Sequence, residues 1–168
     1  MNEKNLKETQ EMQSVIILYD SVFGNTKKVA MSLIRGLEAG GLQVDSSTIQ
    51  EFDTTEIKNY DIIGIGGPTH MRGLSKAMKL FLSKIKHIKL KDKKGFAFET
   101  KASFPLSGSA AKKILKFLKF MKIEVCYPII TAIVVGKEGP LVENTLKIME
   151  ESGLAIAEKV NKQILILK

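Results

Sequence analysis

The chain has 168 residues, of which 44% are hydrophobic and 26% charged, a composition typical of one globular domain. No apolar run approaches the roughly 20 residues of a membrane-spanning helix, and the N-terminus lacks the apolar core of a secretory signal. A lone cysteine, Cys126, excludes an internal disulfide, so we expect a cytoplasmic protein.

The net charge of +8 is concentrated in one part of the chain. Residues 72–122 hold 15 of the 26 basic residues and only 2 of the 18 acidic ones. Such asymmetry indicates an anionic partner, whether an acidic protein, a nucleic acid or a membrane surface. A lysine-rich solvated face would give the same pattern.

The first part of the chain predicts an extension followed by a strand, a helix and a second strand. Residues 1–13 are polar and are interpreted as an extension of a domain that covers 14–168. The apolar run 14–19 predicts a strand buried on both faces. Apolar residues at helical spacing predict a helix over 26–39, and 42–49 predicts a second strand.

The middle of the chain continues the alternation. Residues 50–60 hold at most a short helix, and 61–66 predicts a third buried strand. A helix over 75–85 and a strand over 95–99 follow, and then a loop over 100–108.

The last part predicts a helix over 109–121 and a strand region over 123–135 that is interrupted at Pro128. A turn over 136–140 leads to a final helix over about 141–164. Strands that alternate with helices predict an α/β fold, a doubly wound five-stranded parallel sheet with helices on both faces. Five strands match the order 2-1-3-4-5, whose ligand site lies on the loops after strands 1 and 3.

The loop after the first strand, residues 20–26, suits a phosphate. A helix start leaves backbone N–H groups without partners and favours an anion, and glycine allows a tight turn at Gly24. Side-chain donors are available at Ser21, Asn25 and Thr26. The loop is neither GxxxxGK[ST] nor GxGxxG, and an ordinary turn capped by Asn25 or Thr26 is the alternative.

The loop after the third strand, residues 66–73, reads GGPTHMRG. His70 and Met71 offer flat or polarizable surface to an aromatic ring. His70 could instead act as a general acid, or simply as a hydrogen-bonding loop residue. The loop over 100–108 adds hydroxyls and Lys101, and its alternative is a plain connection with a serine cap.

Together the three loops resemble those of the flavodoxin family. In that family the first loop reads (Ser/Thr)-x-(Thr/Ser)-Gly-x-(Thr/Ser) and binds the phosphate of FMN. Ser21, Gly24 and Thr26 match this pattern, whereas Phe23 stands where a hydroxyl is usual. By the resemblance, His70 or Met71 covers the flavin ring.

The resemblance also implies a set of cofactor-binding residues. The peptide that follows Arg72 would face flavin N5, and the 100–108 loop would contact the pyrimidine end of the ring. The expected site therefore consists of Ser21, Val22, Phe23, Gly24, Asn25, Thr26, Pro68, Thr69, His70, Met71, Arg72, Gly73, Thr100 and Lys101.

The resemblance implies noncovalent FMN binding and electron transfer between redox partners. An FMN-dependent NAD(P)H:quinone oxidoreductase or flavin reductase on the same fold is the alternative, and a binding module that has lost flavin is a third possibility. The family's electron carriers are usually acidic, whereas this chain is basic. We therefore expect an acidic redox protein, and no nucleic acid, to dock near residues 72–122. No metal-ligand spacing is present in the sequence.

Overall fold

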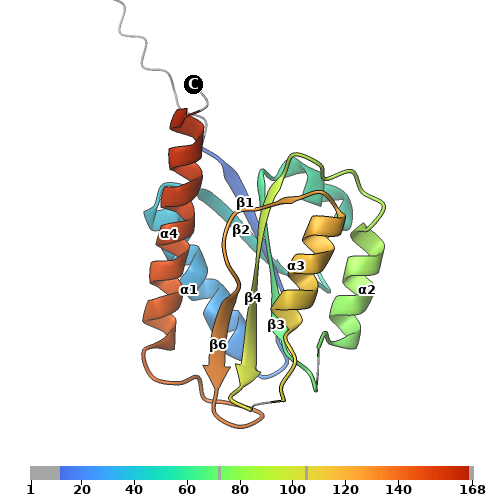
Figure 1. Cartoon of the computed structure of the whole chain (residues 1–168), viewed down its shortest axis with the longest axis vertical. Helices are drawn as coiled ribbons and strands as arrows, with labels where there is room; N and C mark the ends of the chain where they lie inside the picture. The colour runs from blue at the N-terminus through green and yellow to red at the C-terminus, as the bar shows by residue number, and fades with distance from the viewer. Residues whose placement is uncertain (1–11, 72, 105, 167–168) are drawn as a thin grey trace, which may run out of the picture.

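The computed structural model describes residues 12–71, 73–104 and 106–166, in which strands alternate with helices (Figure 1). The strands are β1 (Ser14–Tyr19), β2 (Gln43–Thr48), β3 (Ile62–Pro68), β4 (Lys94–Ala102), β5 (Glu124–Val125) and β6 (Ile130–Val134). The helices are α1 (Asn25–Ala39), the short 3₁₀ helix η1 (Thr54–Asn59), α2 (Lys76–Ile85), α3 (Ala110–Phe120) and α4 (Thr145–Ile166).

The strands form one parallel sheet of order β2-β1-β3-β4-β5, and β6 also pairs with β4. β5 and β6 contact successive parts of one edge of β4, because Glu124 pairs with Lys94 and Ile130 pairs with Phe98. They therefore share the fifth position of the sheet. The doubly wound parallel sheet of order 2-1-3-4-5 that the sequence predicts is confirmed.

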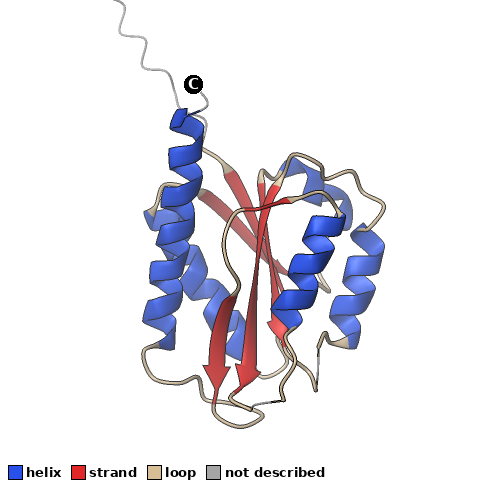
Figure 2. Cartoon of the chain, in the orientation of Figure 1, coloured by secondary structure: helices blue, strands red, loops and turns tan. Residues whose placement is uncertain are grey.

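Helices cover both faces of the sheet (Figure 2). α1 and α4 pack on the face that includes Val15 and Phe96. α2, α3 and η1 pack on the opposite face, which includes Ile63 and Ala97. Successive residues of a strand point to opposite faces, so covering both faces requires the continuous apolar runs seen in the sequence.

α1 and α4 approach each other at two glycines. A Cβ atom on Gly36 would collide with the carbonyl oxygen of Glu150, and one on Gly153 would collide with the carbonyl oxygen of Leu33. An ion pair also joins the helices, since Arg35 Nε lies 3.0 Å from a carboxylate oxygen of Glu150. The backbones of the two helices are therefore in direct contact.

The predicted end of the fourth strand is wrong. β4 continues to Ala102, so Thr100 and Lys101 belong to the strand and not to a loop over 100–108. The cause is pairing with β6, in which Thr100 lies beside Ala132. The extension carries these two residues to the same edge of the sheet as the ends of β1 and β3.

The predicted interruption of the strand region 123–135 at Pro128 is confirmed: two short strands are separated near this proline, which has no N–H to donate to a neighbouring strand. The predicted start of the final helix needs correction. The final helix begins at Thr145 and not at 141, because Leu141 instead forms a bridge with the end of β6. The connection between β6 and α4 is therefore longer than the predicted turn.

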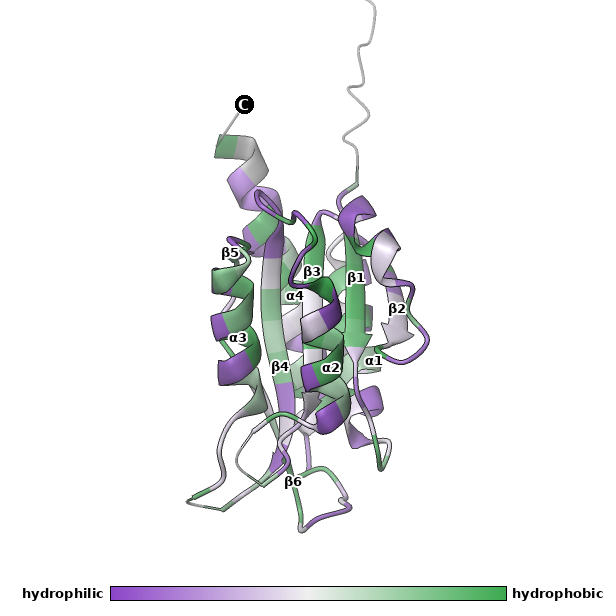
Figure 3. Cartoon of the chain, turned by 90° about the vertical axis from the view of Figure 1, so that its right-hand side faces the viewer, coloured by the Kyte–Doolittle hydropathy of each residue, from purple (hydrophilic) through white to green (hydrophobic). Residues whose placement is uncertain are grey.

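Hydrophilic positions face outward on α2 and α3 (Figure 3). The exposed lysines of these helices are Lys76, Lys79, Lys84, Lys112, Lys113, Lys116 and Lys119. Of the predicted extension over 1–13, residues 1–11 lie outside the described part of the chain. No helix among the described residues is long and apolar enough to cross a membrane.

Candidate functional site

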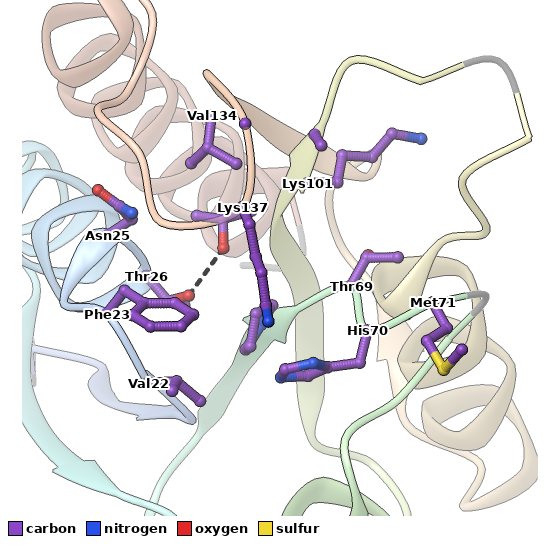
Figure 4. A pocket seen from close by; sticks show the side chains of 14 residues that line it. Val22, Phe23, Asn25, Thr26, Thr69, His70, Met71, Lys101, Val134 and Lys137 are labelled. Carbon is purple, nitrogen blue, oxygen red and sulfur yellow. Dashed lines mark hydrogen bonds between the residues drawn. The ribbon is translucent and has the colours of Figure 1, made fainter.

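A cavity of about 340 Å³ opens at the carboxyl ends of the central strands (Figure 4). Three loops, the ends of β3, β4 and β6 and the start of α1 contribute to its walls, although the segments lie far apart in the sequence. The lining residues are Val22, Phe23, Asn25, Thr26, Pro68, Thr69, His70, Met71, Thr100, Lys101, Ala102, Val134, Gly136 and Lys137.

The start of α1 forms one wall of the cavity. Its N-cap is Gly24, which adopts a φ of 83° and provides no side-chain cap. Within the described residues, the backbone N–H groups of residues 22–26 find no acceptor in the protein; the next N–H, of Lys27, donates to Ser21 Oγ at 3.2 Å. The first turn also contains no acidic residue. These donors and the helix dipole make this helix start attractive to an anion.

The start of α3 differs from that of α1, because a buried carboxylate already accepts hydrogen bonds there. Ser109 Oγ caps the helix by accepting the N–H of Lys112 at 3.0 Å. That hydroxyl donates to Glu99 at 2.9 Å, and the carboxylate also accepts the N–H of Ala111 at 3.0 Å. Glu99 is 1% exposed. The buried carboxylate thus satisfies the helix start from inside the protein.

α2 uses the same arrangement with another buried carboxylate. Ser75 Oγ accepts the N–H of Met78 at 3.0 Å and donates to Asp20 at 2.6 Å. Asp20 is 4% exposed and also accepts a hydrogen bond from Gln50. Of α1, α2 and α3, which all begin at this edge of the sheet, α1 therefore begins with its N–H donors still available.

Two predicted donors in the first loop make internal hydrogen bonds. The side-chain amide of Asn25 donates to the carbonyl oxygen of Glu138 at 2.8 Å and so holds the loop after β6 against α1. The hydroxyls of Thr26 and Thr100 lie 2.8 Å apart, and either can donate. A hydroxyl can donate one hydrogen bond and accept another, so the Thr26 hydroxyl can serve a ligand when Thr100 is the donor between them.

Flat and apolar side chains lie around the remaining walls. Phe23 and His70 point into the cavity from different loops, and Lys137 extends into the space between them (Figure 4). Phe23 is 46% exposed and Met71 is 95% exposed. Met71 lies in a tight turn with a φ of 49°, and the turn is closed by reciprocal backbone hydrogen bonds between His70 and Gly73. The cavity therefore combines a surface suited to an aromatic ring with donors suited to an anion.

The structure brings ten of the fourteen expected site residues into the walls of this cavity. Ser21 and Gly24 belong to the same loop but do not line the cavity, and Gly73 lines a neighbouring one. Arg72 lies outside the described residues. Lys101 is half-buried and its ammonium lies 3.4 Å from the carbonyl oxygen of Gly108.

Sequence reasoning missed the contributions of the end of β4, the end of β6 and the loop that follows β6. Ala102, Val134, Gly136 and Lys137 line the cavity, although residues 136–140 are predicted only to turn the chain. Glycine and proline in this segment indicate a loop. Its place beside α1 follows from the pairing of β6 with β4 and from the Asn25 hydrogen bond, which local sequence does not encode.

Cys126 lies away from the cavity as a small core residue. It is 1% exposed, and burial raises the pKa of its thiol to about 11. A buried thiol with so high a pKa is a poor nucleophile at neutral pH. No cluster of three metal-ligating side chains occurs among the described residues.

Comparisons with known proteins agree with this architecture. A nitric oxide reductase from Moorella thermoacetica is 29% identical over 122 residues, which are 70% of this chain and 30% of that protein. The chain spans less than a third of the length of the curated relatives that it matches.

The fold is also found in solved structures, among them the following two. A flavodoxin from the domain Archaea superposes with a TM-score of 0.74 at 24% identity, covering 88% of this chain and 99% of that one. The rubredoxin oxygen:oxidoreductase from Desulfovibrio gigas gives a TM-score of 0.76 at 21% identity, covering 90% of this chain and 37% of that one. Residues 16–120 match the family described as the flavodoxin domain. The chain therefore belongs to the flavodoxin-domain family.

Proposed function

We propose that the protein binds FMN noncovalently at this cavity and carries electrons between redox proteins. The observation that carries the proposal is the start of α1, where the N–H groups of residues 22–26 have no acceptor within the described residues. A dianionic phosphate would accept several of them and would interact favourably with the helix dipole. The relationship to flavodoxins, and the likeness to proteins named rubredoxin oxygen:oxidoreductase and nitric oxide reductase, support a redox role.

The residues present fit both ends of FMN. In this proposal the phosphate is held by the 22–26 backbone and by the Thr26 hydroxyl. Phe23 and His70 flank the flavin ring, and Lys101 and Lys137 place positive charge beside the cofactor. FMN would supply the redox chemistry, whereas the chain binds it, orients it and sets its electrostatic surroundings.

The arrangement favours a mononucleotide over a dinucleotide. The sequence lacks the GxGxxG pattern that brings a backbone close to a pyrophosphate. The uncapped start of α1 offers a place for one terminal phosphate. FMN is therefore proposed in preference to FAD, NAD or NADP.

Replacing Thr26 tests the placement of the phosphate. Thr26→Ala should weaken FMN binding roughly 10- to 100-fold, since a hydrogen bond to a charged group contributes about 1.5–3 kcal/mol. Riboflavin, which has no phosphate, should lose little affinity. Thr54→Ala is a matched control in η1, where the side chain makes no hydrogen bond within the described residues. Binding is measured by quenching of flavin fluorescence.

The outcomes separate the alternatives. Equal losses for FMN and riboflavin would place the phosphate elsewhere, and the absence of any flavin binding would refute the cofactor. Steady oxidation of NADPH or NADH with a quinone would favour a flavin-dependent oxidoreductase over a carrier.

We also propose that the redox partner is an acidic protein. The lysines of α2 and α3 give one side of the molecule a positive potential close to the cavity. Electron transfer to such a partner should slow as salt rises, because the Debye length falls from about 10 Å at 0.1 M to about 3 Å at 1 M. Reversing Lys112, Lys116 and Lys119 to Glu should lower the association rate and leave FMN affinity nearly unchanged. A rate that responds to neither change would contradict an acidic partner.

A further inference from the structure

A second cavity, of about 540 Å³, lies beside the first. The two cavities share His70 and Met71, so these two residues lie between them. Their turn is held by hydrogen bonds of 2.9 and 2.8 Å between the backbones of His70 and Gly73. Anything bound in the second cavity would therefore lie next to the proposed flavin site.

Three lysines from two helices line the second cavity. Lys76 and Lys79 lie in the first turn of α2, and Lys113 lies in the first turn of α3. The Lys113 side chain lies so close to Gly73 that a Cβ atom at that glycine would collide with it. The charges thus converge on the cavity wall instead of spreading along separate helix faces.

No carboxylate among the described residues neutralises these lysines. The ion pair that the described residues contain joins Arg35 and Glu150, on α1 and α4, across the sheet from the second cavity. The carboxylates at the adjacent helix starts, Asp20 and Glu99, are buried and are hydrogen-bonded to uncharged donors. The lining of the cavity contains no acidic side chain.

The three positive charges around this cavity repel one another, and a bound oxyanion would offset that repulsion by attracting all three. The surroundings indicate the source of the oxyanion. Exposed lysines continue beyond the cavity along both helices, and Met71, which lies between the two cavities, has 95% of its surface exposed. An extended charged surface with an apolar contact at its edge matches a protein better than a small anion.

We infer that this cavity, here called the lysine pocket, receives a carboxylate side chain of an acidic protein partner and docks that partner against His70 and Met71. Its role in electron transfer rests on the proposed function. The binding of the carboxylate itself does not require FMN. The docking site is then formed by three lysines next to the cofactor cavity and not by the whole basic region.

The test uses a fluorescently labelled hexaglutamate peptide as the probe, followed by anisotropy at low ionic strength with and without added FMN. The first variant replaces Lys76, Lys79 and Lys113 with Gln. The matched control replaces Lys84, Lys86 and Lys119 with Gln, which removes the same charge from α2, its C-cap residue and α3, but outside the pocket. All six lysines are exposed, so both variants should fold, which circular dichroism checks.

We expect the pocket variant to weaken peptide binding at least tenfold and the control variant to weaken it less than threefold. Equal losses in the two variants would overturn the pocket and leave only a general attraction to the basic face. Displacement of the peptide by equimolar inorganic phosphate would overturn a protein carboxylate as the occupant. If FMN fails to bind but the peptide still distinguishes the variants, the proposed function fails and the lysine pocket stands.

Discussion

Glu99 makes the most demanding prediction, because one buried carboxylate connects three parts of the candidate site. It accepts hydrogen bonds from the hydroxyls of Thr69 and Ser109, from the N–H of Ala111 and from the hydroxyl of Thr131. These partners come from the end of β3, the start of α3 and β6. Glu99→Ala should therefore loosen the cavity wall as well as destabilise the fold.

The magnitude follows from the groups that would be left behind. A buried donor without an acceptor costs about 1–3 kcal/mol, and the N–H of Ala111 would be one. The free-energy cost at the hydroxyls of Thr69 and Ser109 would be smaller, because each hydroxyl still accepts a hydrogen bond from a backbone N–H of α3. Together these terms give a loss of about 2–4 kcal/mol in the free energy of unfolding, or a fall in Tm of roughly 4–16 °C.

Urea denaturation followed by circular dichroism measures this loss, and FMN titration of the same variant measures the site. Glu124→Ala is the control, since Glu124 is exposed on β5 and its side chain makes no hydrogen bond within the described residues. The control should change stability by less than about 0.5 kcal/mol. A Glu99→Ala protein as stable as the control would refute the role assigned to this carboxylate.

Three further predictions address packing, the core thiol and the cofactor site. Gly36→Ala should destabilise the protein by about 1–3 kcal/mol through overpacking against α4, although alanine is favoured over glycine by about 1 kcal/mol in an isolated helix. An increase in the urea midpoint of unfolding would contradict the close contact between the helices. The raised pKa of Cys126 means that its thiol stays protonated to higher pH in the folded than in the unfolded protein, so the free energy of unfolding of the wild type should fall by about 2–3 kcal/mol relative to that of Cys126→Ala between about pH 9 and 11. Parallel curves of unfolding free energy against pH for the two proteins would show that the pKa is not raised. Lys101→Met should lower the second one-electron reduction potential of bound FMN by about 40 mV, because one unit charge at a partly exposed site contributes about 1 kcal/mol. A potential that is unchanged in a dye-coupled redox titration would place the Lys101 ammonium too far from the flavin ring.

Features encoded by local sequence were predictable. The apolar run at 14–19 fixes β1, and the placement of residues 20–26 between a strand and a helix identifies an anion-suited loop. Alternation of strands and helices then restricts the topology to the doubly wound sheet, which brings the loops after β1 and β3 together.

Features that depend on distant pairing were not predictable. Lys137 reaches the cavity because β6 pairs with β4 and Asn25 holds the following loop. Thr100 lies in a strand for the same reason. The partners of buried Glu99 lie up to 32 residues away from it in sequence, and no local pattern identifies them.

The backbone amides at the start of α1 offer the most direct test of the account. Amide proton shifts of residues 22–26 are followed in ¹H–¹⁵N spectra while FMN, and separately riboflavin, is added. We predict that several of these amide protons move downfield with FMN, as they donate to the phosphate, and move much less with riboflavin. If FMN binds and these amides respond equally to both ligands, the phosphate does not lie at the start of α1.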